Sequence, residues 1–217
     1  MHRYQICIEY VGTNFIGWQI QKKGNSVQGF IQKQISKILG EKITLFGSGR
    51  TDTGVHAIEQ SAHFDCKKEI KNFSAFLNSA NHFLNRKLVS ILSIKKRKKT
   101  FHARHSAKTR CYIYIIYNRE GSLSLNKNKG WHLKKKLDLN LLKRGCKKLI
   151  GTHDFSSFRA SSCGAKSPIR TIKNISVTKS KNKIQIKFKS RSFLQKQVRS
   201  MVGCLKCLAE TSWSLEN

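Results

Sequence analysis

Apolar and polar residues change their period along the first half of the chain, and the changes predict strands and helices in turn. Between Ser26 and Gly40 the apolar residues recur every three or four positions, the period of an amphipathic helix with Ser26 as its N-cap. From Ile58 to Asp65 they alternate with polar residues, as in a half-buried strand. The same reasoning predicts a helix at residues 72–84 and strands at residues 4–10, 43–46 and 87–94. The resulting order, β-α-β-β-α-β, is that of a ferredoxin-like unit.

The second half of the chain repeats part of this order. The predicted elements are a long strand at 109–118, a helix at 139–150, strands at 171–178 and 184–188, and a final helix at 194–208. The segments 119–136 and 154–169 are expected to be loops, because they are polar and show no period.

The two halves therefore predict an α+β fold with two domains. We place the boundary after residue 105, so that residues 1–105 form an N-terminal ferredoxin-like half and residues 106–217 a C-terminal one. The second order, β-α-β-β-α, stops one strand short of the first. The residues after Ser214 are too few to supply a closing strand.

A glycine-rich loop lies between two predicted strands of the first half. Residues 46–57 read F-G-S-G-R-T-D-T-G-V-H-A, with Asp52 two residues after Arg50. Glycines allow tight turns and close backbone approach. No Gly-Lys-Ser/Thr follows, which excludes a P-loop, and the ligand spacing of an EF-hand is absent. Two interpretations stay open: a hairpin whose Asp and Thr side chains cap backbone N–H groups, or a loop that presents a carboxylate for chemistry.

The charge balance indicates a polyanionic partner. The 217 residues include 43 Lys and Arg against 11 Asp and Glu, which gives a net charge of +32 and a pI near 10.3. Nucleic acid is the simplest such partner, although charge alone does not choose between RNA and DNA. Only 12 of the basic residues are Arg, and the chain is rich in Ile and Asn, as AT-rich coding favours. Part of the lysine surplus is therefore expected on a solvated surface.

The cysteine content and the hydropathy of the chain further limit the class of protein. Seven cysteines without a regular spacing, and no signal peptide before the first strand, fit free thiols in a reducing cytoplasm. Cys204 and Cys207 form a lone C-x-x-C, and only Cys163 and His153 lie nearby in sequence to complete a zinc site. We interpret the cysteines as small core residues and expect no metal. No apolar run approaches the length of a membrane span.

Several segments together resemble the tRNA pseudouridine synthase A family. Residues 49–57 read G-R-T-D-T-G-V-H-A, and further segments follow in the family's order over nearly the whole chain. These segments are 17–19, 26–28, 101–104, 112–118, 154–159 and 198–203. An isolated R-T-D would be weak evidence, whereas the ordered set is highly specific.

The resemblance implies an enzyme that isomerises uridine to pseudouridine without a cofactor. Its substrate would be tRNA, on the 3′ side of the anticodon stem-loop, and the enzyme would act in the cytoplasm as a homodimer in which one tRNA touches both subunits. The implied fold has two ferredoxin-like halves whose mainly antiparallel sheets join around a central basic cleft. The β-α-β-β-α-β order of the first half agrees with this fold independently.

The resemblance also assigns residues. Asp52 corresponds to the essential aspartate, which acts as nucleophile or base beside the ribose and uracil. Arg50 and Arg199 resemble cations that hold this carboxylate ionised, although a structural ion pair is an alternative. Tyr112 matches the tyrosine that stacks on the target base, unless it is a core residue of its strand. Residues expected to contact tRNA are Arg104, Arg110, Arg159, His56 and His102.

Two departures from the family bear on activity. The family usually continues beyond the W-S-L-E segment, Trp213–Glu216 here, with a further helix and a strand, so the sequence is either a fragment or a shortened protein. Gln197 stands where the family has methionine, and we expect its amide to find a partner or to face solvent, because burying it unpaired is costly. The leading hypothesis is therefore an active tRNA-uridine isomerase, and the alternative is a tRNA-binding remnant with impaired catalysis. A ribosomal type of basic RNA-binding protein would not require Asp52 in a glycine loop.

Overall fold

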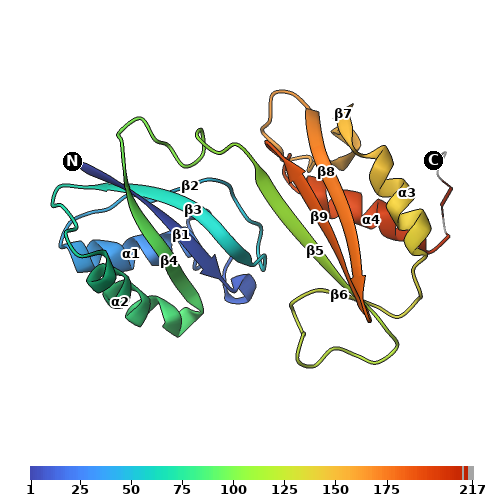
Figure 1. Cartoon of the computed structure of the whole chain (residues 1–217), viewed down its shortest axis with the longest axis horizontal. Helices are drawn as coiled ribbons and strands as arrows, with labels where there is room; N and C mark the ends of the chain where they lie inside the picture. The colour runs from blue at the N-terminus through green and yellow to red at the C-terminus, as the bar shows by residue number, and fades with distance from the viewer. Residues whose placement is uncertain (212, 215–217) are drawn as a thin grey trace. The chain divides into compact units, whose positions relative to one another are not determined.

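The chain folds into two compact units that divide between Ala107 and Lys108. The computed structural model describes residues 1–211 and 213–214. Each unit consists of one β-sheet and two α-helices, so the expected α+β class is confirmed (Figure 1).

The first unit has the strand order of a ferredoxin-like fold. Its strands are β1 (His2–Tyr10), β2 (Phe46–Gly47), β3 (Ala57–Cys66) and β4 (Val89–Arg97), and its helices are α1 (Val27–Leu39) and α2 (Phe73–Leu84), with short 3₁₀ turns η1 (Gly12–Asn14) and η2 (Asn85–Lys87). The sheet order is β2-β3-β1-β4, and every neighbouring pair is antiparallel. The predicted β-α-β-β-α-β order is therefore confirmed.

The core of the first unit lies between one face of this sheet and the two helices. Tyr4, Ile6 and Ile8 are fully buried and alternate with more exposed residues, so they line one face of β1. The helices α1 and α2 pack against each other over the sheet (Figure 1). The predicted helix signals are confirmed: Ser26 Oγ accepts the N–H of Gly29 at 3.1 Å, and Gly40 ends α1 with a φ of 66°.

The strand predicted at residues 43–46 is wrong in its extent. Only Phe46 and Gly47 pair with β3. Ile43 and Leu45 are fully buried, but their N–H groups donate to side chains of α1, to Ser36 Oγ at 3.0 Å and to Gln32 Oε1 at 3.1 Å. Their apolar pattern thus reflects burial beside a helix and not pairing in a sheet.

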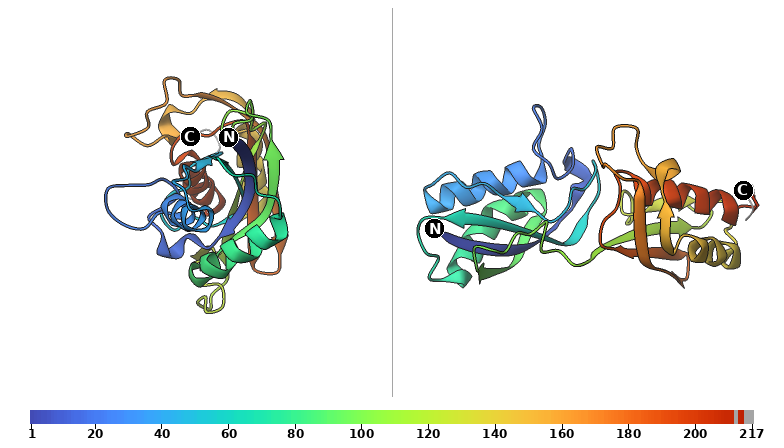
Figure 2. Two further views of the ribbon diagram at one scale, coloured as in Figure 1. Left: turned by 90° about the vertical axis from the view of Figure 1, so that its left-hand side faces the viewer. Right: turned by 90° about the horizontal axis from the view of Figure 1, so that it is seen from above.

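The second unit is built around a five-stranded sheet. Its elements are β5 (Arg110–Asn118), β6 (Trp131–Leu133), α3 (Leu139–Lys148), β7 (Gly151–Asp154), the turn η3 (Ser156–Phe158), β8 (Ile169–Ser180), β9 (Lys183–Ser190) and α4 (Gln197–Ala209). The sheet order is β6-β5-β9-β8-β7, and only the β5–β6 pair is parallel. The helices α3 and α4 pack side by side (Figures 1 and 2).

Two strands of this unit were not predicted. β6 lies inside the segment expected to be a loop, and β7 lies between the end of the predicted helix and the second expected loop, which it overlaps at Asp154. Both are edge strands of three and four residues, too short to show a period of two. The order of the second unit is therefore β-β-α-β-β-β-α, and no strand follows α4 within residues 197–211 and 213–214.

Gln197 is fully buried at the start of α4. Its Oε1 accepts the N–H of Leu194 at 2.8 Å, while its Nε2 has no hydrogen-bond partner among the described residues. The expectation for this side chain is thus half wrong: it finds a partner for its oxygen, but its nitrogen neither pairs nor faces solvent.

Candidate active site

Asp52 lies in a loop that joins β2 to β3, residues 48–56, here termed the Asp52 loop. The N–H of Val55 donates to the carbonyl oxygen of Asp52 at 3.1 Å and closes a turn, which Gly54 completes with a φ of 77°. Gln60 of β3 donates its Nε2 to the carbonyl oxygen of Gly49 at 2.6 Å. Asp52 itself is half-buried, so its carboxylate lies at the surface of a well-bonded turn.

The segment that follows β1 holds this loop in place. The N–H of Trp18 donates to the carbonyl oxygen of Thr51 at 3.0 Å, and the hydroxyls of Tyr10 and Thr51 are 2.9 Å apart. The N–H of Gly12 donates to Nδ1 of His56 at 3.0 Å. Asp52 is therefore positioned from both sides by residues about forty positions earlier in the chain.

Glycines make the contact between these two segments close. A Cβ on Gly12 would lie 2.0 Å from the carbonyl oxygen of Val55, and one on Gly17 would lie 2.6 Å from that of Thr51. A Cβ on Gly47 would lie 2.6 Å from the ring of Trp18, which is buried beneath the start of the loop. Only glycine fits at these three positions, because backbone or a buried ring occupies the space.

The sequence-predicted residues of the first unit occupy two segments. Arg50, Asp52 and His56 share the Asp52 loop, with Arg50 exposed and His56 half-buried on Gly12. His102 and Arg104 lie instead on the segment that follows β4. The N–H of Arg104 donates to Nδ1 of His102 at 3.2 Å, so the histidine helps to shape its own turn.

That later segment is fastened to the sheet by two residues that sequence reasoning missed. Arg3 forms a bidentate pair with Asp65, both contacts at 2.7 Å, and donates to the carbonyl oxygens of Lys99 and Phe101. The same hydrogen bonds from Arg3 lower the pKa of the Asp65 carboxyl. His63, which is 1% exposed, accepts the N–H of Ala103 on its Nδ1 at 3.2 Å.

Tyr112 lies on β5 of the second unit, on the same strand face as Tyr114. It is half-buried, and its ring meets that of Phe193 edge to face at 5.2 Å. Ile116 on this face is fully buried, whereas the two tyrosines lie nearer the surface. Ile116 is thus a core residue of this face, whereas Tyr112 is only partly buried.

Arg199 lies in the first turn of α4 and lines a cavity of about 320 Å³. Tyr114 and Trp131 form an aromatic wall of this cavity, with ring centroids 6.3 Å apart. The cavity is completed by Lys196, Ser200 and Gly203. Burial raises the pKa of the Tyr114 hydroxyl, and Arg199 opposes this effect. An aromatic wall with two cations suits a planar, anionic ligand such as a nucleotide. Trp131 and Lys196 were missed because neither lies in a recognised motif.

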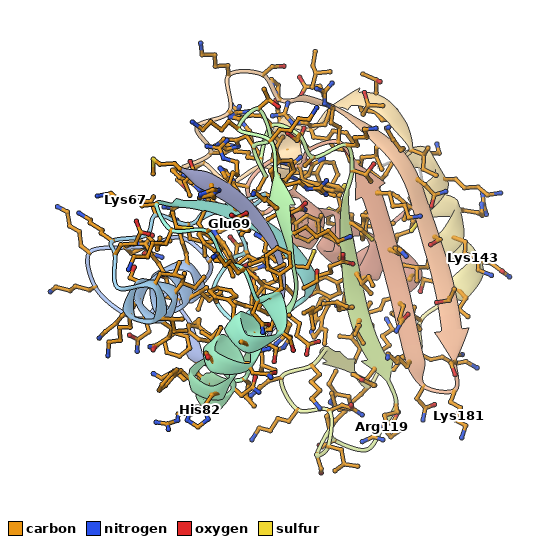
Figure 3. The ribbon with its side chains drawn as sticks, turned by 60° about the vertical axis from the view of Figure 1, so that its left-hand side comes forward. Lys67, Glu69, His82, Arg119, Lys143 and Lys181 are labelled. Carbon is orange, nitrogen blue, oxygen red and sulfur yellow. The ribbon has the colours of Figure 1, made fainter. Side chains whose placement is uncertain are left out.

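The other two predicted tRNA contacts of this unit differ in exposure. Arg110, half-buried at the start of β5, donates its Nη1 to the carbonyl oxygen of Arg191. Arg159 is exposed after η3, and Asp154 nearby has its pKa lowered mainly by hydrogen bonds from Ser156. Many further cations extend from the surface, among them Lys67, Arg119, Lys143 and Lys181 (Figure 3).

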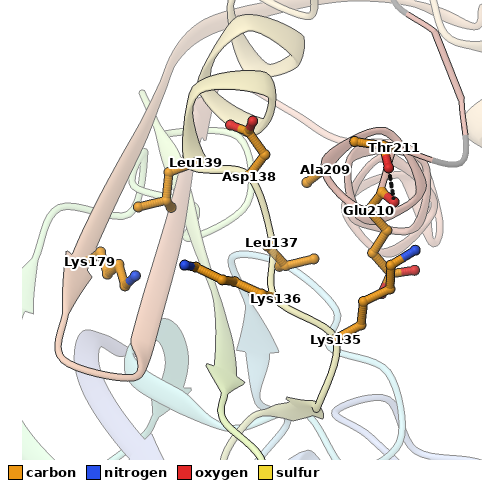
Figure 4. Close-up of a pocket in the computed structure, with 9 residues that line it drawn as sticks. All are labelled: Lys135, Lys136, Leu137, Asp138, Leu139, Lys179, Ala209, Glu210 and Thr211. Atoms are coloured by element: carbon orange, nitrogen blue, oxygen red, sulfur yellow. Dashed lines mark hydrogen bonds between the residues drawn. The ribbon is translucent and has the colours of Figure 1, made fainter.

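A second cavity of the second unit, of about 450 Å³, lies between α3, β8 and the end of α4 (Figure 4). Its charged lining mixes Lys135, Lys136 and Lys179 with Asp138 and Glu210. Asp138 is already used as the N-cap of α3, where its carboxylate accepts the N–H groups of Asn140 and Leu141. This cavity holds none of the sequence-predicted site residues.

The cysteines agree only in part with their interpretation as core residues. Cys66 and Cys146 are buried, and burial raises their pKa to about 11 and about 12. Cys111 is exposed on β5, so for this residue the interpretation is wrong.

Among residues 1–211 and 213–214, no three His, Cys, Asp or Glu side chains are grouped so as to hold a metal ion. Over the same residues, no helix combines the length and the apolar character needed to cross a membrane.

A ferredoxin-like unit that presents one carboxylate on a glycine-packed loop, in a strongly basic chain, defines the class of RNA-modifying enzymes that the sequence resembles. A family model described as tRNA pseudouridine synthase matches residues 6–106 and 146–217. The chain therefore belongs to the tRNA pseudouridine synthase family, and the resemblance seen in the sequence is confirmed.

Individual relatives agree with this assignment. A protein of Pelagibacter ubique named tRNA pseudouridine synthase A is 63% identical over 216 residues, which is 100% of this chain and 88% of the relative. A protein of the same name from Paramagnetospirillum magneticum is 42% identical over 99% of this chain and 83% of its own length. One from Brucella ovis is 38% identical over 100% of this chain and 87% of its own length.

Proposed function

We propose that this protein isomerises uridine to pseudouridine in tRNA, with Asp52 as the catalytic carboxylate. The observation that carries the proposal is the Asp52 loop itself. The loop is fastened to the segment after β1 by the Trp18–Thr51 and Gly12–His56 hydrogen bonds and by glycine contacts closer than any other residue allows. Such a rigid mounting is what a group needs when it must meet a reacting atom with sub-ångström precision.

The reaction exchanges one glycosidic bond for another. The bond between C1′ of the ribose and N1 of uracil breaks, the base turns, and a bond forms between C1′ and C5. The hydrogen on C5 leaves to solvent and N1 gains a proton, so the product is an isomer of the substrate. The Asp52 carboxylate is proposed as nucleophile or base in this sequence, and Arg50 and Arg199 are proposed as its orienting or ion-pair partners.

Tyr112 is proposed to stack on the target base. Its ring is half-buried and held edge to face by Phe193, so its remaining surface is presented in a fixed orientation. The proposed substrate region is the 3′ side of the anticodon stem-loop, whose unpaired bases can be extruded at low cost. Arg104, Arg110 and Arg159, with His56 and His102, are proposed tRNA contacts, and a homodimer in the cytoplasm is the proposed working form.

Tritium release from tRNA labelled at uracil C5 tests the reaction directly, because forming the new glycosidic bond must expel that hydrogen. We expect release by the unmodified chain and by Asp138→Asn, in which asparagine still caps α3. We expect none by Asp52→Asn, with tRNA affinity retained. Reverse-transcription mapping of the product should place pseudouridine in the anticodon stem-loop, and light scattering should give the mass of two chains.

The tritium-release assay also tests the alternative function, a tRNA-binding protein with impaired catalysis. A folded chain that binds tRNA but releases no tritium would refute the isomerase and leave a tRNA-binding protein. Equal release by the unmodified chain and Asp52→Asn would refute the role of Asp52 alone.

A further inference from the structure

A cluster of aromatic rings lies on the surface of the first unit, at the start of the Asp52 loop. Phe46 of β2 stacks on His63 of β3, with ring centroids 5.1 Å apart and an interplanar angle of 22°. His102 lies 4.6 Å from His63 and 5.8 Å from Phe46. His105 lies 4.5 Å from His102, and Phe101 lies 6.0 Å from His63. We call these five residues the ring cluster.

The cluster is buried at its base and open at its top. His63 is 1% exposed, whereas Phe46 is 45% exposed and His105 is exposed as well. A phenylalanine that leaves this much of its ring in water is common in isolation, but here it stacks on His63 and adjoins the tilted rings of His102 and His105. The open side is therefore a group of aromatic rings rather than a single apolar side chain.

Two imidazoles of the cluster, those of His63 and His102, are neutral at neutral pH. Burial lowers the pKa of His63 to about 4, helped by His102 and Arg3 nearby, and burial also lowers the pKa of His102. In each ring Nδ1 accepts a backbone N–H, from Ala103 and from Arg104, so the proton lies on Nε2. Neutral rings held by the backbone present a rigid face for stacking.

The surroundings of the cluster are cationic. Arg97 lies over the ring of Phe101 at 5.3 Å, and Arg104 is exposed on the same segment as His102 and His105. Asp65, the carboxylate that acts on His63, is held by its bidentate pair with Arg3. An apolar aromatic surface with cations beside it suits an unstacked nucleobase with its phosphates and repels a cationic or strongly solvated partner.

We propose that the ring cluster, through Phe46, His102 and His105, is a stacking surface for an unpaired nucleobase of the RNA substrate. This inference rests on the proposed function for the identity of the RNA. Phe46 is six residues before Asp52, a span of at most about 20 Å of extended chain. The site of the bound base and the uridine that meets Asp52 are therefore close in space, on one face of the same unit.

The test compares two phenylalanines of similar exposure in the same unit. Phe83 of α2 is 41% exposed, meets a histidine ring edge to face and has an arginine over its ring, whereas Phe46 stacks on its histidine. Phe46→Leu and Phe83→Leu both remove a π face and keep apolar bulk. Dissociation constants of the full-length variants would be measured for tRNA and for a fully paired RNA duplex, over a series of salt concentrations, with thermal melting as the check of folding.

We expect Phe46→Leu to weaken tRNA binding by about 5- to 150-fold, the range for one stacked base, and Phe83→Leu to leave it unchanged. Duplex binding should be unchanged in both. The slope of log K against log salt should also be unchanged, because stacking releases no counterions. Wild-type affinity of Phe46→Leu for tRNA would overturn the inference, as would an equal loss for duplex and tRNA or a smaller salt slope.

These outcomes are separable from those of the proposed function. If the unmodified chain releases tritium and Phe46→Leu binds tRNA normally, the stacking surface is refuted and the isomerase stands. If the unmodified chain binds tRNA without releasing tritium, the isomerase is refuted, and the affinity of Phe46→Leu still decides the stacking surface. A chain that does not bind tRNA refutes both.

Discussion

The substitution Gly12→Ala tests whether the close packing of the Asp52 loop serves catalysis. The new Cβ would lie 2.0 Å from the carbonyl oxygen of Val55 and 2.6 Å from its carbonyl carbon. Both are backbone atoms, so no side chain can rotate away. Ordinary contact begins near 3.4 Å, so the two segments must separate by about 1.4 Å at this point. Gly12 lies in η1 without a positive φ, so alanine meets no backbone strain there.

The expected magnitudes follow from this displacement. Overpacking of a close contact costs about 1–3 kcal/mol, and the Gly12–His56 hydrogen bond, 3.0 Å long, would be lost at a further cost of about 1 kcal/mol. For a chain of this size each kcal/mol lowers the melting temperature by about 2–4 °C. A shift of about 1 Å in a catalytic group lowers turnover by about 10²-fold. Gly12→Ala should therefore remain folded at 25 °C but lose about two orders of magnitude in kcat.

Tritium release under single-turnover conditions measures the chemical step, and thermal melting measures stability. Two glycines supply controls. A Cβ on Gly121 meets nothing within 4 Å, so Gly121→Ala should behave as the unmodified chain. Gly54 also has open space but a φ of 77°, so Gly54→Ala should show strain of about 1–2 kcal/mol without a clash. Wild-type turnover by Gly12→Ala would refute the reasoning, because the loop would then absorb a methyl group without moving Asp52.

Two further predictions concern titration and thiol chemistry. The neutral form of His63, with a pKa of about 4 against 6.5 in the unfolded chain, contributes stability that is complete above about pH 6.5 and is lost as the pH falls towards 4. The loss amounts to about 3 kcal/mol, and urea unfolding at a series of pH values should show it in the unmodified chain and not in His63→Gln. Alkylation at pH 8 followed by mass spectrometry should modify Cys111 before Cys66 and Cys146, because these two are buried with their pKa raised to about 11 and about 12. Rapid modification of Cys146 in the native protein would contradict its burial.

The sequence predicted best those elements whose signals are local. The helix between Ser26 and Gly40 has its cap, its period and its terminating glycine within one segment, and the structure reproduces all three. The alternation in β3 likewise needs only one buried face of one sheet. The elements that failed depend on partners elsewhere. Ile43 and Leu45 are buried like strand residues, but their N–H groups are taken by side chains of α1.

The residues of the candidate site show the same difference: some are marked by local sequence signals, and others depend on partners elsewhere in the chain. Asp52 could be proposed as the catalytic carboxylate from its motif, because the carboxylate and the glycines around it are visible in the sequence. His63 could not be found, because nothing in an alternating strand marks which histidine will lie under Phe46 and accept the N–H of Ala103. Trp131 was missed for a related reason: its strand is three residues long and its aromatic partner Tyr114 lies on β5.

The glycines show why the Asp52 loop cannot be understood from its own residues. Gly54 serves the turn through its positive φ, and that role is readable locally. Gly12 and Gly17 lie outside the loop, and their role is the absence of a Cβ where the backbone of Val55 and Thr51 passes. A loop held only by its own turn would move with solvent, and its carboxylate would spend little time in a reactive position. The position of Asp52 therefore depends on the segment that follows β1, and substitutions there should lower turnover before they unfold the protein.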